Sequence, residues 1–235
     1  MSLHRFIAPA AGRSGFPPHP PSIDPPVPAT GARAAASWRA ASALALTAGA
    51  LFGAAPARAA DWTIHVVDAS GAPVPDAVVA VELKGQPAPP AVGKSAVMAQ
   101  RDRQFQPQLL AIQTGTAVTF PNFDTVRHHV YSFSPTKKFE LKLYSGTPAE
   151  PVVFDKAGVA QLGCNIHDRM SAHIVVVDTP LFGIADAKGD VRLDLPPGSH
   201  RLRLWAARLG NAAPTVQPLT VGTGAPGVLK VELKD

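Results

Sequence analysis

The residues with the clearest chemistry lie in one short segment, residues 164–170, which reads CNIHDRM. Cys164, His167 and Met170 follow one another at intervals of three residues, and the histidine pair His128-His129 ends a polar loop upstream. Soft sulfur donors hold Cu(I), imidazole suits both copper oxidation states, and a long axial thioether lets one geometry serve both. The sequence therefore predicts a copper site built from one of the paired histidines and the Cys-x-x-His-x-x-Met segment.

Other interpretations explain these residues less well. Cys164 is the only cysteine, which excludes an intramolecular disulfide framework and a multi-cysteine zinc or iron–sulfur site. A zinc site would gain little from Met170, because zinc prefers a closed tetrahedron of harder or thiolate ligands. A Cys-His hydrolase would need an orienting third group and a helix beginning at the cysteine, and neither is visible.

The elements that must position this site are short strands. Gly and Pro punctuate the chain, and no helical apolar period is sustained over a dozen residues. The stretch from Lys138 to Leu143 alternates, with Phe139, Leu141 and Leu143 on a core face and charged residues on the other. In an antiparallel sandwich, the loop before one strand and the loop between two later strands can converge at one end. We expect strands over 62–67, 78–83, 109–113, 117–120, 129–133, 138–143, 152–154, 159–162, 173–177, 191–195, 201–204 and 228–233.

On these motifs the stretch from Ala96 to Val177 resembles the cupredoxins, the small blue copper proteins, especially the plastocyanin and amicyanin type. Family members carry Asn directly after the first His ligand, and His129 holds that slot here, so the resemblance implies that His128 is the ligand. The implied site is one type 1 copper ion held by His128, Cys164, His167 and Met170. The implied fold is a Greek-key β-sandwich.

The resemblance also implies contacts around the sulfur. In the family, the amide that follows the first His ligand donates to the thiolate, which here would be the N–H of His129. Amicyanin-like proteins carry Pro before the second His, whereas this chain has Ile166. We therefore expect a second N–H bond to the sulfur of Cys164, which would raise the reduction potential.

The flanking segments resemble the two halves of carboxypeptidase regulatory-like (transthyretin-like) sandwich domains. We expect an all-β chain in which a cupredoxin is inserted in, or packed on, a second immunoglobulin-like β-sandwich. The predicted domains are a leader at 1–59, the flanking sandwich at 60–93 and 181–235, and the cupredoxin at 94–180. A contact between Val66 and Leu204 would distinguish this organisation from a single enlarged cupredoxin.

The leader carries an export signal. Arg33 and Arg39 precede an alanine-rich apolar run, and a small-x-small cleavage motif ends at Ala59. The apolar run is short for a membrane span. Without residues 1–59 the chain has 22 − 5 = 17 basic and 17 − 1 = 16 acidic residues, a net charge of +1. We predict a periplasmic protein with no membrane span in its mature form and no nucleic-acid partner.

The function expected from these features is single-electron transfer between redox partners, such as a c-type cytochrome or a periplasmic dehydrogenase. The alternative is a copper carrier or sensor that delivers metal rather than electrons. We do not predict an enzyme, because a copper oxidase needs further His-rich motifs that eight scattered histidines do not supply. Lys137, Lys138 and Lys142 form a basic cluster that reads either as a solvated strand face or as a docking patch for an acidic partner.

Overall fold

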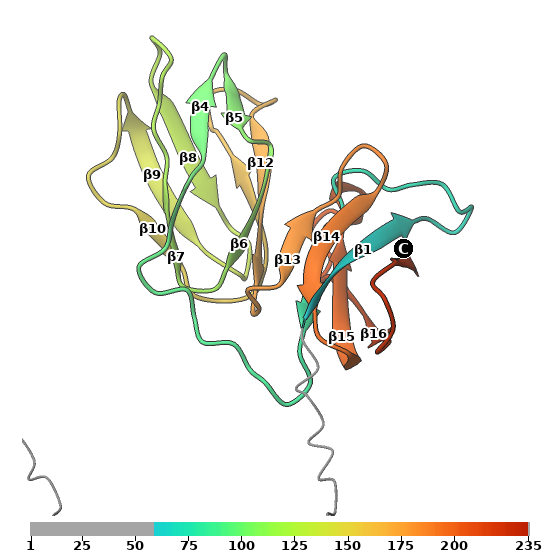
Figure 1. Cartoon of the computed structure of the whole chain (residues 1–235). Coiled ribbons are helices and arrows are strands. Elements are labelled where there is room, and N and C mark those ends of the chain that lie inside the picture. The colour runs from blue at the N-terminus through green and yellow to red at the C-terminus, as the bar shows by residue number, and fades with distance from the viewer. Residues whose placement is uncertain (1–58, 235) are drawn as a thin grey trace, which may run out of the picture. The chain divides into compact units, whose positions relative to one another are not determined.

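The computed structural model describes residues 59–234, so all but the last residue of the predicted leader lies outside the described residues. The described chain consists of strands and one short 3-10 turn at Ala207–Leu209, which confirms the all-β prediction (Figure 1). Within residues 59–234 no helix has the length and apolar character needed to cross a membrane.

The segment that carries the predicted ligands forms two facing sheets (Figure 1). The larger sheet has the strand order β6-β12-β11-β8-β9, and the smaller has the order β10-β7-β3. Their bounds are β3 Ser95–Val97, β6 Leu109–Gln113, β7 Thr116–Thr119, β8 His128–Ser132, β9 Phe139–Tyr144, β10 Val152–Phe154, β11 Gly158–Gly163 and β12 Ser171–Val177. A short hairpin of β4 (Ala99–Arg101) and β5 (Gln104–Gln106) lies beside the loop before β8. One apolar cluster, which includes Phe105, Phe120, Phe154 and Met170, forms the core of this part.

Strand β9 departs from the expected alternation at its end. His128 pairs with Tyr144 and Val130 pairs with Leu141, so β9 contains one more residue than β8 over this stretch. Such a bulge shifts the following side chains to the opposite face. Leu143, expected in the core, is therefore exposed, and Tyr144 packs inward in its place.

The flanking segments form two further sheets. One has the order β14-β1-β17 and the other β13-β2-β15-β16. The bounds are β1 Ala60–Val67, β2 Val78–Glu82, β13 Phe182–Ile184, β14 Asp190–Leu195, β15 Gly198–Trp205, β16 Thr215–Val221 and β17 Val228–Glu232. Both N-terminal strands therefore pair with strands that follow residue 180. Val66 and Leu204 belong to one buried apolar cluster, although the division into domains stays a prediction.

The sequence analysis does not predict five of the observed strands, namely β3, β4, β5, β13 and β16. The first four have only three residues each, too few to show a period of two. β16 contains Pro218, which signals a break, and it lies at the edge of its sheet, where a missing N–H is tolerated.

Candidate metal centre

The segment 164–170 forms a compact loop between the paired strands β11 and β12. β11 ends at Gly163, so Cys164 is the first residue beyond the strand, and it is 5% exposed. The backbone N–H of Met170 donates to the carbonyl of His167 at 2.9 Å, which closes a turn within the loop. His167 is partly exposed, whereas Met170 is buried in the same apolar cluster as Cys164.

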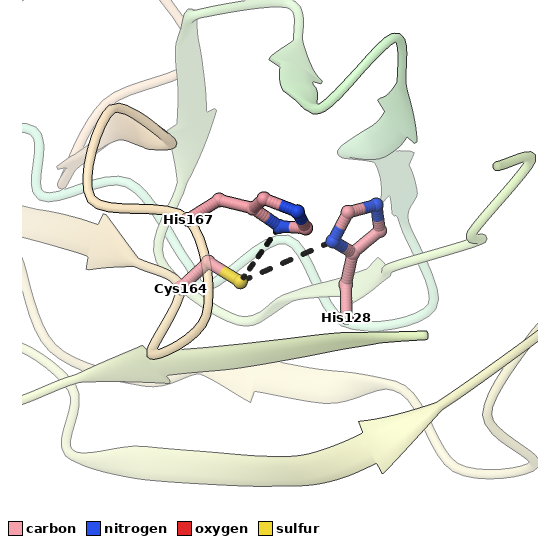
Figure 2. Close-up of side chains that lie close together, drawn as sticks. All are labelled: His128, Cys164 and His167. Atoms are coloured by element: carbon pink, nitrogen blue, oxygen red, sulfur yellow. Dashed lines mark hydrogen bonds between the residues drawn. The ribbon is translucent and has the colours of Figure 1, made fainter. Parts of the chain in front are cut away.

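The loop faces the first residue of β8. His128 is fully buried, and its Nδ1 lies 4.0 Å from the sulfur of Cys164. The Nδ1 of His167 lies 3.9 Å from the same sulfur, and the two imidazole centroids are 4.9 Å apart. Figure 2 shows both rings directing Nδ1 toward Sγ. The structure thus brings together a thiol from one loop and two imidazoles, with ligand atoms within 4.8 Å of one another.

These distances are compatible with one shared metal ion. In zinc sites, metal–sulfur and metal–imidazole bonds measure about 2.3 Å and about 2.0 Å, so two donors on one ion are at most about 4.3 Å apart. Both sulfur–nitrogen distances fall below that limit. One thiol and two imidazoles beside a buried methionine are the donor types found in copper electron-transfer sites.

A carboxylate fixes the tautomer of His128. Nε2 of the ring lies 2.7 Å from Oδ2 of Asp124, whose side chain is only 13% exposed. Nε2 therefore carries the proton and donates to the carboxylate, which leaves the Nδ1 lone pair directed at Cys164. A carboxylate behind a ligating imidazole orients the ring and raises its basicity as a ligand.

Asp124 is held by backbone amides of the β4–β5 hairpin. The N–H groups of Asp102 and Arg103 donate to its two carboxylate oxygens at 2.7 and 3.0 Å. Both hairpin residues have positive φ, near 55°, as a tight two-residue turn requires. Burial alone would raise the pKa of Asp124, but the bonds from Arg103, His128 and Asp102 outweigh it and hold the pKa below its ordinary value. The carboxylate is accordingly ionised at neutral pH.

Asn122 shapes the loop that carries Asp124. Its side-chain oxygen accepts the N–H of Asp124 at 2.9 Å, and its amide donates to the carbonyls of Val126 and Tyr144. The side chain, itself buried, thereby satisfies backbone groups that a loop would otherwise leave unpaired.

His129 points away from the thiol. Its Nε2 lies 2.8 Å from the Glu140 carboxylate, and its buried Nδ1 has no hydrogen-bond partner. Within residues 59–234, the polar groups in contact with the sulfur of Cys164 are the Nδ1 atoms of His128 and His167. The expected N–H bonds from His129 and Ile166 are therefore not seen.

A half-buried tyrosine packs against the apolar cluster that contains Cys164 and Met170. The hydroxyl of Tyr144 donates to the carbonyl of Phe120 at 2.6 Å and accepts the side-chain amide of Gln100. Burial raises the pKa of Tyr144 to about 12, the Gln100 bond lowers it, and the nearby charge of Cys164 adds to the rise. The phenol therefore stays neutral beside the thiol.

Sequence reasoning singled out the four predicted ligands but missed the residues that support them. Asp124 belongs to the polar loop before His128, and its place four residues before that histidine could have signalled a partner for the ring. Gln100 carried no such signal, because its contact with Tyr144 depends on the bulge in β9.

No protein-family model matches the chain, and no curated protein matches it. Among solved structures, it is similar to a reduced tryptophan-to-tyrosine variant of amicyanin, with 18% identity over 43% of this chain and 99% of that one, at a TM-score of 0.33. An oxidised proline-to-alanine variant of amicyanin gives 19% identity over 42% and 98% of the two chains, with a TM-score of 0.33. A purple cupredoxin from Nitrosopumilus maritimus gives 22% identity over 36% and 99%, with a TM-score of 0.30.

Proposed function

We propose that this protein binds one copper ion in a type 1 site, which His128, Cys164 and His167 would hold as the strong donors and Met170 as a weaker fourth donor. The observation that carries the proposal is the approach of two imidazole Nδ1 atoms to one buried sulfur, at 4.0 and 3.9 Å. Bound there, copper would supply a one-electron couple. The protein's part is to aim the imidazole rings at the sulfur and to exclude water from the site.

The exposure of the ligands supports electron transfer as the role. His128, Cys164 and Met170 are buried, whereas the imidazole of His167 reaches partial exposure. Electrons would therefore enter and leave through the edge of His167. Its neighbour Ile166 is 48% exposed, so an apolar surface adjoins that edge. Such a surface suits brief contact with a redox protein, for which we propose a c-type cytochrome or a periplasmic dehydrogenase.

We further propose that residues 94–180 form the copper-binding module and that 60–93 and 181–235 form a second sandwich, in which the module is inserted or on which it packs. The pairing of β1 with β14 and β17 supports this organisation. Export through the leader would place the protein in the periplasm. No bond of a substrate is made or broken in this scheme, so the protein acts as a carrier and not as an enzyme.

A visible spectrum after addition of Cu(II) tests the site. We expect an intense sulfur-to-copper charge-transfer band that is absent in Cys164→Ser and in His128→Asn. The matched control is His129→Asn, which alters the neighbouring histidine and should retain the band. Loss of the band in the control and its retention in His128→Asn would overturn the ligand assignment.

Metal delivery is the alternative function, and copper retention distinguishes it. An electron carrier holds copper in both oxidation states and gives a reversible potential. A delivery protein releases copper readily to a chelator in one of the two states. We expect retention in both, because the buried ligands are positioned before the metal arrives.

A further inference from the structure

Four exposed arginines belong to the loops that form the candidate metal centre or support it. Arg127 directly precedes the ligand His128, and Arg169 lies in the loop between His167 and Met170. The other two belong to the β4–β5 hairpin, which contacts the same site through Asp124. Arg103 donates its N–H to that carboxylate. The guanidinium of Arg101 lies 4.8 Å from the ring centroid of Phe123, in the loop before β8.

These guanidinium groups, here called the arginine rim (Arg101, Arg103, Arg127 and Arg169), have no carboxylate partner among the ion pairs of residues 59–234. The exposed acidic residues of the same loops are Asp102 and Asp168, so the surface charge is 4 − 2 = +2. The carboxylate of Asp124 is not counted, because it faces inward and accepts three hydrogen bonds. Because Asp side chains are short and Arg side chains long, the positive charge extends farther from the backbone.

Exposed apolar side chains lie on the same loops as the arginine rim. Phe123 is 57% exposed, Val126 is 37% exposed and Ile166 is 48% exposed, and all three belong to the two ligand loops. Exposed apolar side chains together with arginine are typical of a protein interface, where aromatic residues and Arg are enriched and Lys is depleted. Guanidinium groups also recognise carboxylates through paired hydrogen bonds.

The lysine cluster predicted from the sequence is a weaker candidate. Lys137 is paired with Asp155 at 3.0 Å. Lys138 and Lys142 flank Glu140, which the buried His129 binds. The cluster thus has a charge of 3 − 2 = +1, and it lies along β9 and the turn before it rather than in the ligand loops.

We propose that the arginine rim docks an acidic redox protein, whose carboxylates surround its own electron-donating or electron-accepting group. This inference rests on the proposed electron-transfer function and adds the charge of the partner and the residues that select it. Electrostatic attraction across such an interface speeds encounter and weakens with salt.

Paramagnetic anions test the surface without using electron transfer. Hexacyanochromate(III), a redox-inert trianion, is added to the isotope-labelled chain, without copper and with Cu(I), and line broadening of the amide signals is recorded. We expect broadening at 101–103, 123–127 and 165–169, and weaker broadening along β9. The trication hexaamminechromium(III) serves as the matched probe of opposite charge and should leave these signals sharp. Broadening centred on β9, or by the trication at the rim, would overturn the proposal.

Substitutions then assign the charge. A trianion about 10 Å from a guanidinium at about 0.01 M ionic strength loses roughly fourfold in affinity when that charge is removed. We expect this loss in Arg127→Gln and in Arg169→Gln, and about tenfold or more in the double variant. The control removes two charges from β9 and its preceding turn, as Lys138→Gln with Lys142→Gln, and should change the affinity much less.

Electron transfer provides the second arm. The rate of oxidation of the Cu(I) protein by hexacyanoferrate(III) should fall in the rim variants and with added salt, while oxidation by a tripositive cobalt complex should rise. An unchanged rate with the anion contradicts docking at the rim even if the blue band is present. Absence of the blue band instead contradicts the proposed function. In that case, the line broadening by hexacyanochromate(III) in the copper-free chain still shows whether anions bind at the arginine rim.

Discussion

Removal of the carboxylate behind His128 should weaken copper binding without altering any ligand. Asp124 accepts three hydrogen bonds, of which Asp102 donates to Oδ1, whereas Arg103 and His128 donate to Oδ2. An Asn side chain offers one acceptor, so Asp124→Asn can keep the Oδ2 pair and lose the bond from Asp102. Asp124→Ala loses all three.

The magnitude follows from the burial of the imidazole. His128 has no exposed surface, so its Nε2–H cannot turn to water after Asp124→Ala. A buried donor without an acceptor costs about 1–3 kcal/mol of folding stability. Loss of a carboxylate that orients a ligating histidine lowers metal affinity by about 10-fold to 100-fold, or about 1.4–2.7 kcal/mol. Asp124→Asn should lie at or below the lower end of both ranges.

The assay is competition for Cu(I) with a chromophoric chelator, alongside urea unfolding of the metal-free proteins. Asp186→Ala is the matched control, because Asp186 also accepts two backbone N–H groups in a turn but contacts no imidazole. The control should keep the copper affinity. If Asp124→Ala binds copper within about twofold of the unaltered chain, the carboxylate does not orient the ligand and the reasoning is refuted.

Three further outcomes are expected. A Cβ on Gly163 would lie 2.6 Å from the Tyr131 ring, so Gly163→Ala should lower the free energy of unfolding in urea by about 1–3 kcal/mol. Gly224→Ala, at a position that faces open space, should not lower it, and equal effects of the two substitutions would contradict the contact. The chain has two tyrosines, so ultraviolet titration of the Tyr131→Phe variant reports Tyr144 alone. The midpoint of that titration should lie near pH 12, and the stability that the neutral phenol contributes should be present below pH ~10 and be lost above it. A midpoint near 10 would show an exposed phenol. Burial lowers the pKa of His173, so the neutral ring is favoured in the folded protein and the free energy of unfolding should fall as pH drops below ~6.5. His173→Gln should reduce that fall. Identical pH profiles of stability for the two proteins would contradict this role of His173.

The strand pattern was predictable where strands were long enough to show alternation. The stretch 191–195 was predicted from its alternation, and it forms all but the first residue of β14, whose side chains alternate between buried and exposed. The segment from Lys138 was correct through Leu141 and failed at Leu143, because one extra residue reverses every later side chain. A bulge depends on pairing with a partner strand, so no pattern within 138–144 could reveal it.

The loop 164–170 was the part of the site that the sequence predicted best, because its residues are close together in the chain. Its three predicted ligands lie within seven residues, and a short loop between two paired strands confines them. His128 could be placed only through the convergence of two loops, and the choice between it and His129 depended on which side of a strand each occupies. The structure turns His128 toward the thiol and His129 toward Glu140, as alternation along β8 requires.

The hydrogen bonds that hold Asp124 behind His128 could not be predicted from the sequence, because they come from a hairpin whose sequence shows no strand or turn signal. β4 and β5 have three residues each, and the turn between them contains neither Gly nor Asn. Yet this turn aims two N–H groups at Asp124, which in turn fixes the proton of His128 on Nε2. The geometry of Nδ1 at the sulfur is thus set by backbone conformation some 25 residues earlier. Arg101 and Arg103 extend from the same hairpin, so one element both orients the first imidazole and contributes half of the arginine rim. A change in the conformation of this turn would therefore alter the proposed copper site and its charged surface together, whereas a change in the side chains of Arg127 or Arg169 would alter the surface alone.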